Sequence, residues 1–273
     1  KRVNDKVFII LPKKSDGNLR KNSRVTLQEP QRCPMEIFTK EIIARSRKQR
    51  KKEFCSAGDI FRMLEMAAGE HNRALGFGRS RLLENDAAWI LTGQKVRFLV
   101  MPRPGQKLRI GTWLGKMRFA LFSRHYLIED EQNHPVIRAA SNWTLLHLKN
   151  RSILPPKKAG ISVEPVVTGT ELELEKHIPA AKAPPSLQRA VLPEDIDANG
   201  HVNNAVYADW IEEYLTSPDS GLSLPALRSI SIQYRHELRL GDRVQIRTER
   251  SGDRILLTGE SEGKTAFCAA AEG

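Results

Sequence analysis

The chain has 273 residues, of which 40% are apolar, and carries a formal net charge of +12. This length and composition allow a sizeable core, in one large domain or two small ones. No apolar run approaches the roughly 20 residues of a membrane-spanning helix. The three scattered cysteines lack the paired spacing of a zinc site or a disulfide framework. We therefore expect no membrane span, no metal and free thiols, which are typical of a reducing cytoplasm.

The positive charge is concentrated at the start of the chain. Residues 1–52 hold 16 Lys and Arg against 5 Asp and Glu, a net +11. Residues 1–35 lack sustained hydrophobic periodicity, so we predict a basic irregular arm there. The densest run, RSRKQRKK (45–52), either solvates a turn or contacts an acidic partner, which could be nucleic acid, a membrane or an acidic protein. Interleaved aromatics and a helix-turn-helix pattern are lacking, so nucleic acid is not expected as the partner.

A regular pattern begins near residue 36. EIFTKEIIARS (36–46) alternates loosely, as a strand does, and AGDIFRMLEMAAGEHNRALG (57–76) has the periodicity of a helix. Asp59 can cap the start of this helix and Gly76 fits its end. Turn-like separators divide the next residues into four predicted strands. These are WILTGQKVRFLVM, QKLRIGTWLGKM, RFALFSRHYLIED and VIRAASNWTLLHLK.

Composition changes after residue 150, and then the first pattern returns. Residues 151–186 hold six of the fifteen prolines and no aromatic residue, which predicts a linker crossing between two halves. Beyond it, IQYRHELRLGDRVQIRT (232–248) aligns with VRFLVMPRPGQKLRIGT (96–112) at a constant offset of 136, with Gly241 opposite Gly105. Each copy follows a helical segment. We predict one α+β unit used twice, at 36–150 and 187–273, with the two sheets paired edge to edge.

Chemically active side chains crowd one stretch of the second half, DIDANGHVNN (195–204), just before a helix predicted at about 203–215. Asp195 and Asp197 could simply cap turns, and Asn199 could be a turn residue. Glu237 is predicted in the middle of a strand, where glutamate is disfavoured, so this carboxylate needs a reason such as general base catalysis. The first copy lacks these groups, which predicts an apolar pocket there.

DANGHVNN followed by YRHE resembles the acyl-acyl-carrier-protein (acyl-ACP) thioesterases, which carry Asp-x-Asn-x-His-Val-Asn-Asn and a later Tyr-Arg-x-Glu. The resemblance spans roughly residues 36–273 and includes GTW and ASNWTLL. It implies a tandem hotdog fold, in which each half is a long helix wrapped by a curved antiparallel sheet. It also implies catalytic roles for Asp197, Asn199, His201 and Glu237, and no cofactor. The family often has a cysteine after the glutamate, and here that residue is Leu238.

Thioester hydrolysis requires an activated water and a stabilised oxyanion. The start of a helix offers free N–H groups and a favourable dipole. We therefore expect the backbone amides of Gly200, His201 and Val202 to contact the oxyanion. Met63, Met66 and Trp89 are candidates for the acyl pocket, although core packing explains them equally well.

The resemblance implies an acidic acyl carrier protein with its phosphopantetheine-linked chain as the partner. We expect basic residues to help dock it, namely Arg47, Lys48, Arg50, Lys51 and Lys52. Two alternatives stay open: an acyl-coenzyme A thioesterase, and a non-catalytic regulator that binds acyl thioesters and contacts DNA through its basic arm. A homodimer is possible. The expected location is a bacterial cytoplasm, or the plastid stroma if a transit peptide is missing, since the chain opens with Lys1 rather than Met.

Overall fold

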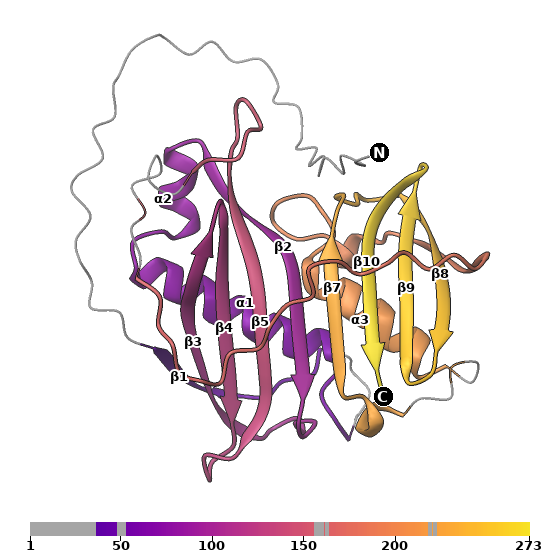
Figure 1. The fold of residues 1–273 in the computed structure, drawn as a ribbon, viewed down its shortest axis with the longest axis horizontal. Helices are drawn as coiled ribbons and strands as arrows, with labels where there is room; N and C mark the ends of the chain where they lie inside the picture. The colour runs from indigo at the N-terminus through magenta and orange to yellow at the C-terminus, as the bar shows by residue number, and fades with distance from the viewer. Residues whose placement is uncertain (1–36, 48–52, 156–160, 162–163, 218–219, 221–222) are drawn as a thin grey trace.

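The computed structural model describes residues 37–47, 53–155, 161, 164–217, 220 and 223–273 (Figure 1). The predicted arm at 1–35 and the basic residues 48–52 lie outside these ranges. The first half contains β1 (Phe38–Ile43), α1 (Ala57–Ala74), α2 (Arg79–Glu84), β2 (Ala87–Phe98), β3 (Lys107–Arg118), β4 (Leu121–Glu129) and β5 (Pro135–His147). The second half contains β6 (Pro185–Ala190), η2 (Pro193–Asp195), α3 (Asn204–Leu215), η3 (Leu224–Ala226), β7 (Ser229–Tyr234), β8 (Arg243–Ser251), β9 (Arg254–Ser261) and β10 (Lys264–Glu272).

The described strands form one antiparallel sheet of ten strands, in the order β1-β3-β4-β5-β2-β7-β10-β9-β8-β6. The two halves meet where β2 pairs with β7, with Val96 opposite Ile230. The order of the second half mirrors that of the first, so β2 corresponds to β7 and β3 to β8. Both long helices lie on the same face of the sheet (Figure 1). The structure thus confirms the α+β tandem hotdog architecture and the edge-to-edge pairing expected from the sequence.

Two glycines mark the internal repeat. Gly105 and Gly241 have φ values of +88° and +85°, in the region that glycine adopts without a steric penalty. The Gly105 N–H donates to the Ala44 carbonyl just after β1, and the Gly241 N–H donates to the Val191 carbonyl just after β6. The two glycines therefore occupy equivalent turns, as the offset of 136 residues predicts.

The caps of α1 explain where this helix begins and ends. Ser56 is the N-cap and forms a capping box with Asp59, which therefore lies in the first turn rather than at the cap itself. Gly76, with φ +76°, follows the helix end, as predicted. Of the helices in the described ranges, none is both long and apolar enough to cross a membrane.

The two helices also contact each other through polar groups at the start of α1. The carboxylate of Glu212 on α3 accepts a hydrogen bond from the Ala57 N–H, and Asp209 accepts from Arg62 at 2.6 Å. A Cβ added to Gly58 would lie only 2.3 Å from the Asp209 carboxylate, so a larger residue here would displace that carboxylate from its contact with Arg62. The contact fixes α3, and the loop before it, against the first half of the chain.

Residues 164–184, between β5 and β6, cross the face of the sheet opposite the helices (Figure 1). The Ile178 N–H donates to the Gln233 side chain on β7, and the Ala181 N–H donates to Thr258 on β9. Ile178 is buried with Cys268 of β10. The exact limits of this linker and of the two halves remain predictions.

Candidate active site

The loop before α3 is a tight turn that holds its side chains close together. The Asp197 N–H donates to the His201 carbonyl at 2.9 Å, and the Gly200 N–H donates to the Asp197 carbonyl at 3.0 Å. Gly200 has φ +80°, which only glycine adopts readily. The side chain of Asn203 then caps α3 by accepting from the Ala205 N–H. The turn therefore presents Asp197, Asn199 and His201 directly ahead of the helix.

Asp195 has a structural role in this loop. Its buried carboxylate accepts from the Leu192 N–H at 2.9 Å, and its carbonyl accepts from the Asn203 N–H at 2.9 Å. These bonds join the short η2 turn to the start of α3. The turn-capping interpretation of Asp195 is therefore confirmed.

Glu237 meets His201 from the other side of the loop. Its Oε2 lies 3.1 Å from His201 Nε2, and the two side chains are 18% and 12% exposed. The two atoms are close but poorly aligned for a hydrogen bond, so Oε2 accepts none in the described structure. Glu237 is not in a strand, contrary to prediction, because β7 ends at Tyr234. The chain bends away there, which carries the carboxylate to the start of α3.

Burial shifts the protonation of both partners. It raises the pKa of Glu237 to about 7, an effect that Arg239 and Arg151 oppose and Asp197 reinforces. The same burial, helped by Arg239 and opposed by Asp197, lowers the pKa of His201. Near neutral pH the pair therefore consists of a neutral imidazole beside a carboxyl group that exchanges its proton easily.

Asn199 joins Asp197 to a residue of the first half. Its amide Nδ2 donates to Asp197 Oδ2 at 3.0 Å, and its backbone N–H donates to Asp197 Oδ1 at 2.7 Å. Its Oδ1 accepts from Arg79 Nη2 at 2.9 Å and from Arg79 Nε at 3.2 Å. Arg79 is the first residue of α2, and no motif in the sequence indicates its role.

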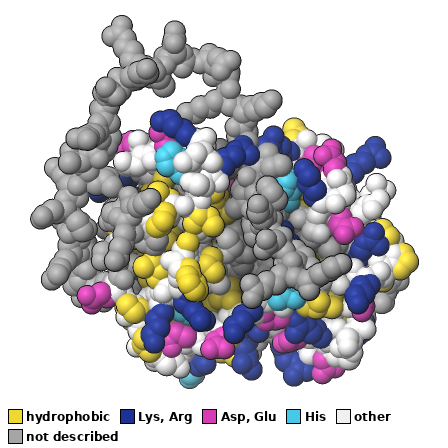
Figure 2. All heavy atoms as spheres, turned by 45° about the horizontal axis from the view of Figure 1, so that its top comes forward, with side chains coloured by type: hydrophobic (Ala, Val, Ile, Leu, Met, Phe, Trp, Pro, Cys, Tyr) yellow, Lys and Arg dark blue, Asp and Glu magenta, His cyan; other side chains and the backbone are white. Residues whose placement is uncertain are grey.

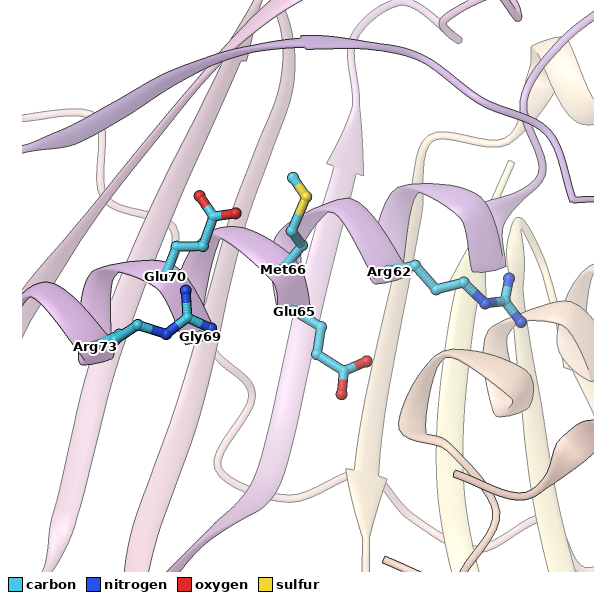
Figure 3. A pocket seen from close by; sticks show the side chains of 6 residues that line it. All are labelled: Arg62, Glu65, Met66, Gly69, Glu70 and Arg73. Carbon is cyan, nitrogen blue, oxygen red and sulfur yellow. The ribbon is translucent and has the colours of Figure 1, made fainter. Parts of the chain in front are cut away.

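A second contribution from the first half is Glu65 on α1. Its carboxylate accepts from Asn203 Nδ2, at 3.1 Å to Oε2 and 3.4 Å to Oε1. Burial raises the pKa of Glu65, and the hydrogen bond from Asn203 opposes this. Figure 3 shows Glu65 pointing to the other side of α1 from Met66 and Glu70, and all three line a groove of about 380 Å³ along this helix. The interpretation that polar site groups come from one copy only is therefore wrong.

A narrow inner cavity lies beside the start of α3. Its volume is about 10 Å³, close to the space that one water needs. Asn204 and Ala205 of α3 line one side of it. The first half supplies the other lining residues, namely Phe61, Glu65, Leu91, Gln94, Tyr126 and Trp143. Aromatic and aliphatic side chains thus surround three polar ones, Glu65, Gln94 and Asn204.

The candidate pocket residues proposed from the sequence do not line this cavity. Met63 is buried in the main core and Met66 is exposed on the outer side of α1. Trp89 packs edge-on against Phe122, with 4.8 Å between ring centroids, in a separate cluster. Core packing therefore explains Met63 and Trp89. The sequence left both interpretations open because helical and strand periodicity do not distinguish a core face from a pocket wall.

The predicted oxyanion contact requires correction at two of its three amides. The Gly200 N–H is donated to Asp197, and the Val202 N–H is donated to the Leu238 carbonyl at 2.9 Å, so neither is free. The His201 N–H has no acceptor within the described residues, and the same holds for the N–H of Asn204, the first helical residue. The Gly200 N–H is bonded within the tight turn and the Val202 N–H is bonded to the chain after β7, which the sequence pattern could not reveal.

Thiol chemistry has no support at this site. Leu238 is fully buried. Cys55 and Cys268 are buried free thiols, and burial raises the pKa of both, that of Cys55 to about 11. Both therefore stay protonated at neutral pH. Cys33 lies outside the described residues.

Three exposed arginines lie within electrostatic range of the carboxylates of the site. Exposed Arg151 and Arg239 act electrostatically on Glu237, and Arg47 does the same on Glu65. Arg47 is the one predicted docking residue within the described ranges, where its backbone N–H donates to Asp59. In Figure 2 Lys and Arg side chains are spread over the face that comes forward, among apolar ones.

Comparisons with known proteins identify the family of this chain. Residues 37–157 match the family model of the acyl-ACP thioesterase N-terminal domain, and residues 181–268 match that of the C-terminal domain. The chain is 28% identical over 172 residues to the chloroplastic acyl-[acyl-carrier-protein] hydrolase FATB2 of Cuphea viscosissima. That alignment covers 59% of this chain and 41% of the relative, so the chain spans about two fifths of that protein's length.

Solved structures share the fold. An acyl-ACP thioesterase from Bacteroides thetaiotaomicron superposes with a TM-score of 0.73 at 21% identity, covering 86% of this chain and 97% of its own. The 12:0-ACP thioesterase from Umbellularia californica gives a TM-score of 0.67 at 19% identity, covering 86% and 96%. At these identities the similarity establishes the architecture of both halves.

Proposed function

Because the chain belongs to the acyl-ACP thioesterase family, we propose that it hydrolyses fatty acyl thioesters of acyl carrier protein to a free fatty acid and the carrier thiol. The observation that carries the proposal is the contact of Glu237 with His201, at 3.1 Å, beside the start of α3. A half-buried carboxylate with a pKa of about 7 is suited to removing a proton from water.

In this mechanism Glu237 takes a proton from a water while the water oxygen bonds to the thioester carbonyl carbon. The developing oxyanion accepts from the free amides of His201 and Asn204, at the positive end of the α3 dipole. The C–S bond then breaks, and Glu237 returns the proton to the departing sulfur. Neutral His201 orients the carboxylate and the water.

Asp197 and Asn199 act on this pair from the loop. Asp197 raises the pKa of Glu237, which makes it a stronger base. The Asn199 side-chain amide is held at its nitrogen by Asp197 and at its oxygen by Arg79. It thereby keeps the turn in the conformation that leaves the His201 N–H free. We assign Asn199 and Arg79 as positioning residues.

The proposed substrate is a medium or long acyl chain on an acidic carrier, and we propose that the first half of the chain supplies its acyl pocket. We propose that Arg47, Lys48, Arg50, Lys51 and Lys52 dock the carrier, supported by the proximity of Arg47 to Glu65. Arg151 and Arg239 would add to the same field. The proposed location, a bacterial cytoplasm or a plastid stroma, rests on the names of the chloroplastic and bacterial relatives.

Graded acyl chains on a carrier test this function. Purified protein is incubated with acetyl-, octanoyl- and palmitoyl-ACP and with the matching coenzyme A thioesters, and the released thiol and free acid are measured. We expect hydrolysis of the two longer chains, faster from the carrier than from coenzyme A. Faster hydrolysis of coenzyme A thioesters favours the alternative that the protein is an acyl-coenzyme A thioesterase. Binding without hydrolysis favours the non-catalytic regulator. Such a protein binds acyl thioesters and needs no groups that activate water.

A further inference from the structure

Gln94 is a buried polar residue that the proposed mechanism does not use. It lies on β2, is 4% exposed and faces the inner cavity. Its side-chain amide makes no hydrogen bond to any residue in the described part of the chain. The amide atoms are not among the fully buried polar atoms that lack a partner, so they reach the cavity, where a water or a polar ligand group can bond to them. An apolar side chain of the same size would leave such a group without a partner. The position is therefore built to meet a polar group that enters the cavity.

The cavity also fixes where on a substrate this polar group would be. Asn204 and Ala205, at the start of α3, line it, and the thioester carbonyl would be polarised at the same helix end. A group in the cavity therefore belongs to one of the first carbons of the acyl chain. The cavity has room for about one water-sized group, which a hydroxyl fills and a branched or charged substituent does not.

Two of the polar residues of the cavity, Gln94 and Glu65, have complementary hydrogen-bonding capacity. Gln94 offers both N–H donors and an acceptor oxygen. Glu65 accepts from Asn203, and its carboxylate has lone pairs left for a further donor. A hydroxyl can accept from the Gln94 amide and donate to Glu65 at once. A keto oxygen can only accept.

We propose that this cavity recognises a hydroxyl next to the thioester, and that the enzyme prefers 3-hydroxyacyl chains to unsubstituted ones. The inference rests on the proposed function and specifies its substrate class. A chain built in two-carbon steps on a carrier bears its hydroxyl at carbon 3, so the substrate would come from a ketone reduction on the carrier. Gln94 is then the residue that determines specificity, with Glu65 as its partner.

Three acyl-ACP substrates of equal length test the inference: decanoyl, 3-hydroxydecanoyl and 3-oxodecanoyl. We expect the wild type to hydrolyse the 3-hydroxy chain with a kcat/KM about tenfold or more above that for decanoyl, since one hydrogen bond in a closed site has about this effect. Gln94→Met should lower the kcat/KM for the 3-hydroxy chain to about that for decanoyl, and should melt close to the wild-type temperature. Leu91→Met, an apolar change in the same cavity, should affect all three substrates alike.

Several results would overturn the inference. A wild type that prefers decanoyl, or treats the three chains equally, contradicts it while leaving the proposed hydrolysis intact. An equal loss on all substrates in Gln94→Met makes the residue merely structural. Equal rates for 3-oxo and 3-hydroxy chains contradict the assignment to a hydroxyl. No hydrolysis of any of the three overturns the proposed function and this inference with it.

Discussion

The side chains of His201 and Glu237 meet between the loop before α3 and the bend after β7, with Nε2 3.1 Å from Oε2. Neither residue belongs to a helix or strand. Two separate backbone features bring them together, the tight turn at Gly200 and the end of β7 at Tyr234. Because both groups are largely buried, each favours its neutral form, and this is the basis of the pH predictions.

The pH dependence of kcat/KM should rise through an apparent pKa near 7, because Glu237 must be ionised to act as a base. The value belongs to the coupled pair with His201. Arg239 lowers the pKa of Glu237, so Arg239→Gln should move the midpoint upward. Asp197 raises that pKa, so the residual activity of Asp197→Asn should titrate at lower pH. Rate profiles between pH 5 and 9 check both directions, and two shifts of the same sign would contradict this assignment.

Stability should show the cost of burying Glu237. Its folded pKa of about 7 exceeds the ordinary value of 4.5, so its contribution to stability is complete below about pH 4.5 and is lost as the pH rises through 7. The loss amounts to at most about 3 kcal/mol. Glu237→Gln should therefore melt above the wild type at pH 8 and close to it at pH 4.5. Thermal unfolding at both pH values measures this, and a variant less stable at pH 8 would disprove the buried-carboxylate argument.

Removing the Arg79 side chain should disturb the loop without unfolding the protein. Arg79→Gln removes the paired contact to Asn199 Oδ1, and we expect kcat to fall about tenfold because the turn holding His201 loses its anchor. The contact is exposed, so the melting temperature should change little. Arg81→Gln, on the exposed side of the same short helix, is the matched control and should retain full activity. Equal kcat values in the two variants would show that Arg79 does not position the site.

Charge reversal tests the docking proposal. Changing Arg47, Lys48, Arg50, Lys51 and Lys52 to Glu should raise KM for acyl-ACP much more than for the same acyl chain on coenzyme A, with kcat unchanged. The difference should shrink with added salt, since exposed charges are screened over about 8 Å at physiological ionic strength. Steady-state kinetics at low and high salt measure both effects. Equal changes in KM for the two substrates would place the carrier elsewhere.

The sequence correctly predicted features that depend on a residue type and on its neighbours in the sequence. Gly105 and Gly241 could be matched because their turns need positive φ, and the ends of α1 could be read from its capping residues. The crowding of Asp197, Asn199 and His201 before a helix could be recognised because all three lie in one turn.

The sequence was uninformative wherever a site contact joins distant parts of the chain. Arg79 and Asn199 are 120 positions apart, and Glu65 and Asn203 are 138 apart, so no local spacing connects them. Glu237 was expected in a strand because alternation continues past Tyr234, but pairing, not periodicity, decides where β7 ends. The oxyanion amides could not be chosen because their availability depends on carbonyls at Asp197 and Leu238.

The most direct test of the account is the single-turnover hydrolysis rate of a medium-chain acyl-ACP by wild type, Glu237→Gln and Asp197→Asn. We predict that the wild type releases free acid and that each variant is slower by about 10²–10⁴-fold, the usual effect of losing a general base or its support, with folding confirmed by thermal unfolding. Near-normal rates in both folded variants would contradict the carboxylate mechanism.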